Sequence, residues 1–359
     1  MKKILGWGTG NVARELFECC PYIEQYEIIG IVDNDINKQG QSFFGIEILP
    51  PSAVAILFYD AIVVMSDAFD DIYDQVARDY PHKVHLVENQ FFFYKNSVLK
   101  RYNGSNDVEI LKVIRYIKEH GLHIFNYPFV EKYKTMDVEV FKDITCNLYY
   151  VVHNEKRMYF SRSFTTEESV KEYYRQILLE QDELSPHRYL KDDFSVESDD
   201  VVVDLGAAEG FFALDTLDKA KKLYVVEMDS GWIEALEHTF APYMDKVIII
   251  KCAISSIDDA PFSKLDTLIE EPVNFIKMDI EGFEWDALLG AEKTIEVSKP
   301  LKLCICAYHS DFDEILIKDF MDNHNISYSV TSGFIWFPYM RRQTWVSTRL
   351  NRGVVRGRK

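Results

Sequence analysis

Residues 201–229 read VVVDLGAAEGFFALDTLDKAKKLYVVEMD, and this stretch decides the fold. It opens with Val201–Val203, a β-branched run that is typical of a strand buried on both faces. Gly206 and Gly210 follow, and then come apolar residues at helical spacing and a second apolar strand that ends at Glu227. A strand, a glycine loop, a helix and a second strand in this order form half of a doubly wound α/β sheet.

The loop and the strand ends predict a nucleoside site. Glycine lets a ligand approach the backbone closely, and the start of the helix presents unpaired N–H groups. Glu227 comes 21 residues after Gly206, which suits an acid that accepts both ribose hydroxyls. We expect the cofactor-binding residues to be Asp204, Gly206, Ala207, Glu209, Gly210, Glu227, Met228, Ala253 and Asp279.

The composition of the loop favours S-adenosylmethionine (SAM) over a dinucleotide. A pyrophosphate-binding loop has the pattern G-x-G-x-x-G, whereas this loop has Gly206, Ala208 and Gly210. The carboxylate of Glu209 would repel a pyrophosphate but attract the sulfonium and ammonium groups of SAM. A bound NAD, or a structural loop without a ligand, remain the alternatives.

The same stretch, together with VVEMD at 225–229 and FIKMDIEGFEWDALLGAEKTI at 275–295, resembles the FkbM-type methyltransferases. The most specific piece is the IK-x-D-x-EG-x-E block, Ile276–Glu284. The resemblance extends from Val201 to the C-terminus. It implies a seven-stranded class I methyltransferase sheet that binds SAM, with transfer usually to an oxygen. The chain departs from the family at LCICAYHS, residues 303–310, where many members carry an acid, so the acceptor stays open.

Three side chains at strand ends are the predicted catalytic residues: Asp279, Glu281 and His309. Histidine titrates nearest neutrality, which makes His309 the preferred general base for an acceptor hydroxyl. Asp279 and Glu281 could instead cap the following helix. The three could together bind a divalent ion, but their spacing is not diagnostic and we expect no metal. His187 and Tyr189 precede the sheet and are further candidates for the pocket.

The N-terminus predicts a second nucleotide-type fold. A strand at Ile4–Leu5 leads into a glycine loop around Gly8, and a later strand ends at Asp33. The third glycine position is Asn11, so the match to a dinucleotide loop is imperfect. A dinucleotide, a sugar nucleotide and an empty structural domain all remain open. The stretch GIVDND, residues 30–35, resembles N-terminal modules of some sugar-modifying transferases.

The predicted fold class is therefore α/β, with two doubly wound Rossmann-like domains. The N-terminal domain is expected at 1–105 and the methyltransferase domain at 196–359. A connecting region at 106–195 follows a polar break at 103–107 and should contain helices and a hairpin, with Thr165 capping one of the helices. The methyltransferase domain should contain a helix over 283–296 and a closing hairpin that pairs 327–330 with 334–337.

Composition narrows the class of partner. The formal net charge of −18 argues against nucleic acid, and no apolar run is long enough to span a membrane. Six cysteines without framework spacing favour a reduced, cytoplasmic protein, with Cys304 and Cys306 as core thiols. Residues 341–359 hold seven Lys or Arg and no acid, so this tail either docks on the acidic body or binds an anionic acceptor.

These observations lead to one main hypothesis and two rivals. The main one is a SAM-dependent O-methyltransferase whose acceptor is a small molecule or a glycan, namely a sugar or a nucleotide-linked glycan hydroxyl. The first rival is an NAD(P)-dependent oxidoreductase that acts from the N-terminal domain near Gly8 and Asp33. The second is a non-catalytic partner protein that binds SAM or sugar. A homo-oligomer is compatible with all three.

Overall fold

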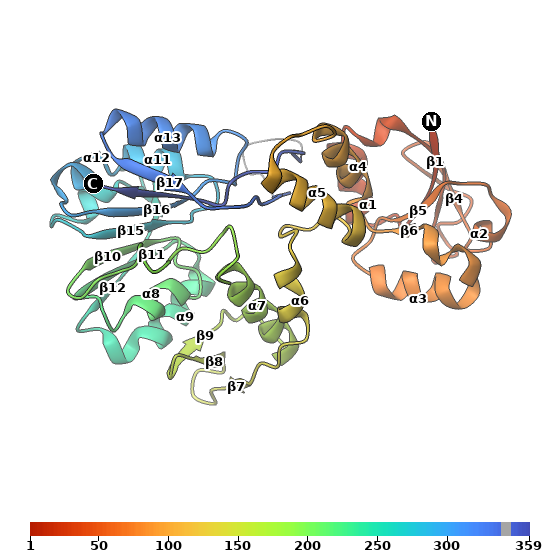
Figure 1. Cartoon of the computed structure of the whole chain (residues 1–359). Coiled ribbons are helices and arrows are strands. Elements are labelled where there is room, and N and C mark those ends of the chain that lie inside the picture. Colours follow the sequence, from red (N-terminus) through yellow and green to blue (C-terminus); the bar gives the residue numbers. More distant parts are fainter. Residues whose placement is uncertain (339–345) are drawn as a thin grey trace. The chain divides into compact units, whose positions relative to one another are not determined.

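The computed structural model describes residues 1–338 and 346–359, and the chain forms two compact units (Figure 1). The first unit holds Met1–His123 and a short later segment that ends at Arg349. The second begins at Ile124 and includes Leu350–Lys359. The boundary thus lies later than the expected 105, because the helix α5 (Val108–His120) belongs to the first unit.

The first unit contains a six-stranded sheet with the order β3-β4-β2-β1-β5-β6. All neighbours pair in parallel except the hairpin of β3 with β4, which confirms the expected Rossmann-like fold. Its elements are β1 Lys2–Trp7, α1 Asn11–Cys19, β2 Tyr26–Val32, β3 Ser42–Phe43, β4 Ile46–Leu49, α2 Ala53–Ile56, β5 Ala61–Val64, α3 Phe69–Asp79, β6 Val87–Glu88 and α4 Phe92–Arg101, followed by α5.

The second unit is built around a seven-stranded sheet with the order β12-β11-β10-β15-β16-β18-β17. The strands are β10 Val201–Leu205, β11 Lys222–Glu227, β12 Val247–Lys251, β15 Phe275–Met278, β16 Lys302–Cys306, β17 Ser327–Val330 and β18 Val354–Arg358. β18 runs antiparallel to both its neighbours. This arrangement confirms the predicted seven-stranded sheet.

One strand of that sheet was predicted at the wrong place. The closing hairpin was expected to pair 327–330 with 334–337, but β17 pairs with β18, far later in the chain. Ile335 makes only an isolated bridge with Asn351. The apolar character of the segment comes from the burial of Ile335 and Trp336 in a loop, not from a strand.

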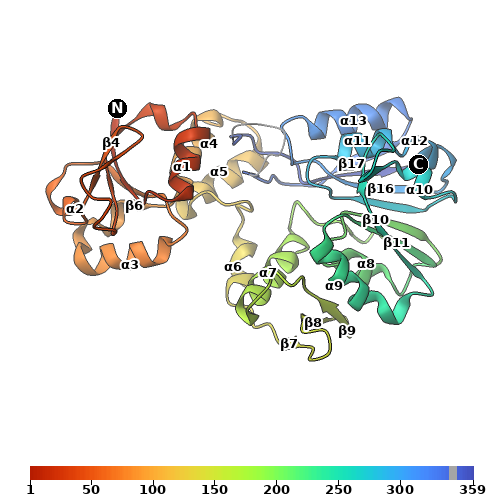
Figure 2. The same ribbon diagram turned by 180° about the vertical axis from the view of Figure 1, so that it is seen from behind.

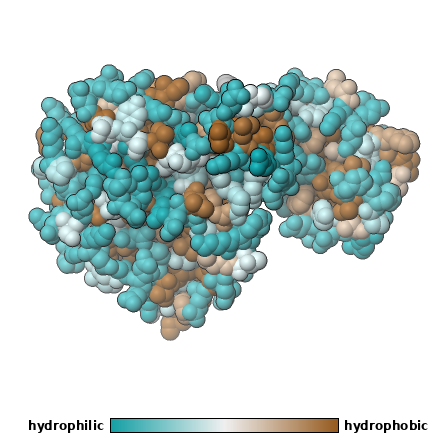
Figure 3. All heavy atoms as spheres, in the orientation of Figure 1, coloured by the Kyte–Doolittle hydropathy of each residue, from teal (hydrophilic) through white to brown (hydrophobic). Residues whose placement is uncertain are grey.

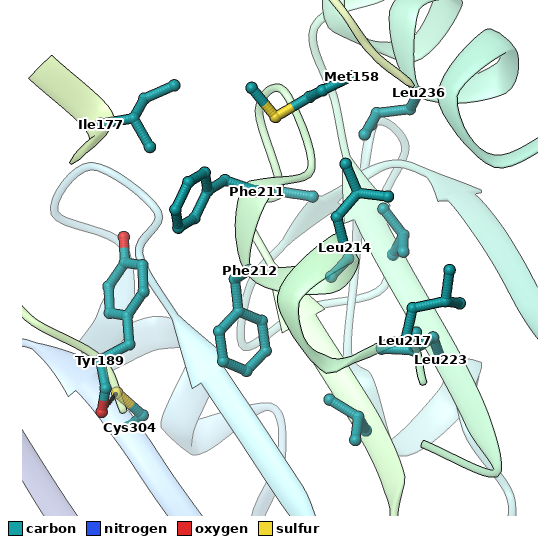
Figure 4. Close-up of a cluster of buried hydrophobic side chains, with 14 of the residues drawn as sticks. Met158, Ile177, Tyr189, Phe211, Phe212, Leu214, Leu217, Leu223, Leu236 and Cys304 are labelled. Atoms are coloured by element: carbon teal, nitrogen blue, oxygen red, sulfur yellow. Dashed lines mark hydrogen bonds between the residues drawn. The ribbon is translucent and has the colours of Figure 1, made fainter. Parts of the chain in front are cut away.

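Alternation along the strands separates the two faces of the sheet. Val202, Leu223 and Phe275 pack on one face, and Val203, Tyr224 and Ile276 on the other. Helices α8 (Phe211–Thr216) and α9 (Ser230–Phe240) cover the first face, and α11 (Glu284–Leu289), α12 (Glu292–Val297) and α13 (Asp313–Asn323) the second (Figures 1 and 2). Figure 4 shows how side chains of α8 pack in the first cluster.

The helix predicted over 283–296 is divided into α11 and α12. Gly290 lies between them, and a Cβ at this position would come 2.0 Å from the carbonyl oxygen of Ser255. The helix ends there because the neighbouring loop packs directly against its backbone.

The segment before the sheet forms a cap over one end of it. It contains α6 (Glu131–Lys134), the three-stranded sheet β7 (Val140–Lys142), β8 (Tyr149–His153) and β9 (Lys156–Tyr159), and the helix α7 (Glu167–Glu180). The expected hairpin is present as β8 and β9, which turn through Asn154 and Glu155, both with positive φ. The remaining short elements are β13 Ala253–Ile254, β14 Phe262–Ser263 and α10 Leu265–Leu268.

Hydrophilic side chains cover most of the surface in Figure 3, and hydrophobic ones lie among them in small groups. Within residues 1–338 and 346–359, no helix combines the length and apolar character needed to cross a membrane.

The cap of α7 gives a first prediction. The sequence suggested Thr165 as the capping residue, but the hydroxyl of Thr166 accepts the hydrogen bond from the Ser169 N–H at 3.2 Å. Thr166→Ala should therefore lower the free energy of unfolding by about 1 kcal/mol. Thr165→Ala, its matched control, should change it by less than about 0.5 kcal/mol. Urea denaturation followed by circular dichroism measures both, and equal losses would contradict the assignment.

Candidate functional site

A cavity of about 810 Å³ lies in the second unit at the carboxyl ends of β10, β11, β15 and β16. Eight of the predicted site residues line it: Gly206, Ala207, Glu209, Glu227, Met228, Ala253, Asp279 and Glu281. Asp204, Gly210 and His309 do not line it. Tyr173 and Glu180 of α7, Tyr189, Trp232 and Tyr308 complete much of the wall.

Gly206 holds the loop after β10 against the end of β15. Its φ is +73°, and a Cβ on it would lie 1.9 Å from the carbonyl oxygen of Asp279. Gly210 has a different task, because it precedes α8 with φ +85° and packs against Leu236 and Phe240 of α9. Only the first glycine therefore shapes the cavity directly.

Glu227 ties the same loop to the end of β11. Its carboxylate accepts hydrogen bonds from the N–H groups of Ala208 (2.9 Å), Met228 (2.7 Å) and Asp229 (2.8 Å). A carboxylate offers about four acceptor sites, so at least one remains for a ligand hydroxyl. Glu227 therefore both orders the loop and faces the cavity.

Asp204 lies beneath the cavity in a buried ion pair. It is fully buried, and its Oδ1 is 3.0 Å from Nζ of Lys277 on the neighbouring strand β15. The same ammonium donates to the carbonyl oxygen of Gly206 at 2.7 Å. Burial raises the pKa of Asp204, and Lys277 lowers it. Burial lowers the pKa of Lys277, but Asp204 and Asp279 together raise it above its ordinary value.

Asp279 is held as an anion at the floor of the cavity. The hydroxyl of Tyr189 donates to its Oδ2 at 2.5 Å, and Nε2 of His187 lies 3.5 Å from the same oxygen. Burial acts to raise the pKa of Asp279, but His187, His309 and Lys277 together hold it far below its ordinary value. Such a carboxylate positions its neighbours but is a poor proton acceptor.

His309 lies behind Asp279, with only 2% of its surface exposed. Its Nδ1 is 2.9 Å from Oε1 of Glu284, and its Nε2 is 3.4 Å from Oδ1 of Asp279. Burial lowers the pKa of His309, but these carboxylates raise it to about 10. The ring is therefore protonated at neutral pH and turned away from the cavity, which favours a positioning role over the predicted role of general base. Glu284, its partner, was not predicted, although it is the last acid of the IK-x-D-x-EG-x-E block.

Glu209 keeps a carboxyl group facing the cavity. Burial raises its pKa to about 7, although its own backbone N–H and Lys277 act to lower it. Its Oε2 accepts a hydrogen bond from the hydroxyl of Tyr173 at 3.2 Å. Glu281 lies on the loop after β15 with φ +56°, and its side chain is 56% exposed.

Aromatic rings form another part of the cavity wall. Tyr173 and Trp232 pack with ring centroids 5.6 Å apart, and the rings of Tyr189 and Phe212 meet edge to face at 5.9 Å (Figure 4). The sequence named Tyr189 as a pocket residue, but it did not single out Tyr173 or Glu180, because nothing local to α7 shows which face covers the cavity.

Comparison with known families agrees with the geometry. Residues 254–326 match the methyltransferase FkbM domain, and residues 1–80 match the C2185-like N-terminal domain. The match to the methyltransferase FkbM domain thus covers the part of the second unit from Ile254 to Ile326. The resemblance noted in the sequence is thereby confirmed.

The solved structures to which the chain is similar include methyltransferases of several kinds. The chain is similar to the methyltransferase FkbM of Methylobacillus flagellatus KT at 17% identity and a TM-score of 0.47, over 99% of this chain and 90% of that one. It is similar to precorrin-6y C5,15-methyltransferase of Geobacter metallireducens GS-15 at 11% identity and a TM-score of 0.35, over 58% and 97%. It is also similar to the tRNA m1G37 methyltransferase of M. jannaschii at 16% identity and a TM-score of 0.35, over 59% and 56%. Comparison with curated proteins gives no match.

Among the described residues of the second unit, two groups of side chains bring three metal-ligating atoms within 4.8 Å of one another: His187, Asp279 and Cys306, and Asp279, Glu284 and His309. The predicted trio differs from the second group by one residue, since it contains Glu281, whose Oε2 lies 4.0 Å from Nε2 of His309. Both groups already contain hydrogen bonds or ion pairs between their members or with Tyr189.

The basic C-terminal tail contributes β18 to the seven-stranded sheet of the second unit. Arg356 donates to the carbonyl oxygens of Arg188 and Tyr189, Arg358 pairs with Asp193, and Lys359 donates to the carbonyl oxygens of Ile295 and Glu296. These three side chains bind groups of the second unit. This agrees with the expectation that the tail docks on the acidic body of the protein. Arg341 and Arg342 lie outside the described residues.

The N-terminal loop has the expected shape. Gly8 has φ +108°, and the carboxylate of Asp33 accepts hydrogen bonds from the Thr9 hydroxyl and the Asp35 N–H. Nζ of Lys38 lies 3.4 Å from the same carboxylate. Asp33, which a ribose would need, is thus engaged by groups of its own domain.

The buried pair of Asp204 and Lys277 gives a second prediction. Lys277→Met would leave Asp204 buried without a counter-charge, so we expect a loss of about 3–5 kcal/mol in the free energy of unfolding. The matched control is Lys302→Met on the adjacent strand β16, where the lysine pairs with the 70% exposed Glu197 and should contribute less than about 1 kcal/mol. Urea denaturation compares the two, and similar losses would refute a special role for the buried pair.

Proposed function

We propose that this protein is a SAM-dependent methyltransferase that acts on an oxygen, most simply the hydroxyl of a sugar. The observation that carries the proposal is the acidic cavity at the carboxyl ends of the strands of an FkbM domain. Six carboxylates line it, from Glu180, Glu209, Glu227, Asp229, Asp279 and Glu281. This surplus of negative charge suits a ligand that carries a sulfonium and an ammonium.

The residues that would hold SAM follow from the loops that reach the cavity. Glu227 has an acceptor site left for a ribose hydroxyl, and Met228 and Ala253 lie on the two loops beside it. Gly206 and Ala207 offer backbone, and Glu209 offers a carboxylate for the ammonium group. When bound, SAM supplies a methyl group activated by a positive sulfur, and the chain has to orient the acceptor and exclude water.

Two resemblances support a sugar acceptor. The FkbM resemblance implies transfer usually to oxygen, and the N-terminal stretch resembles modules of sugar-modifying transferases. The rival oxidoreductase is less well supported, because Asn11 stands at the third glycine position of a dinucleotide-binding loop. The rival without catalysis predicts that SAM binds but no methyl group is transferred to any acceptor.

Titration calorimetry with SAM tests the cofactor assignment. Glu227→Ala removes the ribose acceptor and the hydrogen bonds that order the loop, so SAM affinity should fall by about 1.5–3 kcal/mol, or on the order of 10- to 100-fold. Glu237→Ala, an exposed acid on α9 that pairs with Lys251, is the control and should bind like the wild type. The proposal fails if the wild type binds NAD and not SAM.

The raised pKa of Glu209 predicts a pH dependence of binding. Below its pKa of about 7, Glu209 is increasingly neutral and loses its attraction for the ammonium of SAM. Affinity for SAM should therefore decrease as the pH is lowered from 8 to 6. Glu209→Gln should bind more weakly at pH 8 and should lose this decrease. Calorimetry at several pH values measures both proteins, and an unchanged pH profile in the variant would count against Glu209.

A further inference from the structure

One end of the cavity is formed by α7, the loop after β15 and Tyr308. The negative charge at this end would select among acceptors. This inference rests on the proposed function. Lys277 is the only lysine or arginine among the described lining residues, and its charge is matched by Asp204 and Asp279. A phosphate or carboxylate brought to this end would face the carboxylates of Glu180, Asp279 and Glu281, which repel it.

Most of the carboxylates around the cavity already have partners within the protein. Glu227 accepts from three backbone N–H groups, and Asp229 accepts from two at the start of α9. Asp279 accepts from Tyr189, and Glu209 accepts from Tyr173. Oε2 of Glu281 lies 4.0 Å from the buried ring of His309. These groups order the site, and ligand contacts would add to bonds they already make.

Glu180 differs from them. It lies at the end of α7, and its side chain is 37% exposed although it lines the cavity. Unlike Glu227, Asp229, Asp279 and Glu209, it accepts no hydrogen bond from the described residues, and Nδ1 of His187 lies 3.9 Å from its Oε2. Its carboxylate is therefore available to a molecule in the cavity.

The surroundings of Glu180 favour a proton acceptor. Burial raises its pKa, and the negative charges of Asp279 and Glu281 raise it further, while His187 and Lys277 lower it. Tyr173 on the same helix and Glu209 across the cavity also face this region. A carboxylate whose pKa is closer to the working pH is a better general base than one held far below it, as Asp279 is.

We propose that Glu180 is the general base and that the acceptor is an uncharged or cationic hydroxyl compound, which excludes phosphorylated and nucleotide-linked sugars. As the acceptor oxygen bonds to the methyl carbon, the carbon–sulfur bond breaks and its electron pair passes to sulfur. The hydroxyl proton passes to the Glu180 carboxylate, which later releases it to water. Glu180 replaces His309 in this role because it faces the cavity and His309 does not.

Labelled SAM tests the charge of the acceptor. A cytoplasmic metabolite extract is passed through an anion-exchange column at pH 7, and the full-length protein is incubated with the unbound and the retained fractions. We expect label in the unbound fraction, which holds neutral and cationic compounds. Label in the retained fraction would overturn the proposal, and so would the absence of label from both. In the last case, SAM binding by calorimetry shows whether the proposed function fails as well.

Glu180→Gln tests the base itself. Methyl transfer to the unbound fraction should fall by about 100-fold or more, while the Kd for SAM should stay within about twofold. The control is Glu172→Gln, an exposed acid on the same helix, which should change neither quantity. The wild-type rate should fall as the pH is lowered through the pKa of Glu180, and the residual rate of the variant should not.

The outcomes against the proposal are equally definite. A large loss of SAM affinity in Glu180→Gln would assign Glu180 to the cofactor, and an unchanged transfer rate would show that it is not the base. The substitution removes no hydrogen bond within the described residues, so the melting temperature should match the wild type. If it does not, Glu180→Asp, which keeps the carboxylate, should restore part of the transfer rate, and failure to do so would overturn the role.

Discussion

The buried ammonium of Lys277 is the interaction on which the site depends. It lies on β15, pairs with Asp204 on β10 and binds the carbonyl oxygen of Gly206, so it joins two central strands to the glycine loop. The strands that follow β10 along the chain, β11 and β12, lie on one side of this pair of strands. β16, which follows β15, lies on the other side. Ligands of open α/β sheets bind at such a reversal of strand order. One charge therefore stabilises the point where the cavity opens.

Local sequence patterns predicted most of the central sheet because each pattern reports burial along a few residues. Val201–Val203 is buried on both faces, and the loop with Gly206 turns where the glycine is found. The last strand could not be predicted in the same way. The apolar residues at 334–337 are buried in a loop, whereas β18 carries Arg356 and Arg358, whose polar heads bind carbonyl groups of the segment before β10. A periodic apolar pattern indicates that residues are buried, but it does not show which part of the chain buries them.

The candidate site shows the same limit. The acids at the strand ends could be placed together, because the carboxyl ends of parallel strands share one edge of a sheet. The protonation state of each group could not be predicted in this way. His309 was preferred as a base for its ordinary pKa, yet its pKa depends on Glu284, 25 positions earlier in the chain, and on burial behind Asp279. Glu180 lies on a helix whose capping residues were visible but whose cavity-facing side was not.

The surplus of acids around the cavity explains why its groups have such different pKa values. Carboxylates that share a poorly solvated space cannot all ionise freely, so Asp279, with His187, His309 and Lys277 beside it, keeps a low pKa, whereas the pKa values of Glu180 and Glu209 are raised. A sulfonium nucleoside bound against Glu209 would favour the ionised form of that carboxylate, so cofactor binding and the ionisation of Glu209 are linked under the proposed function. Glu180 contacts the acceptor and not the cofactor in this proposal, so its raised pKa serves the proton transfer alone.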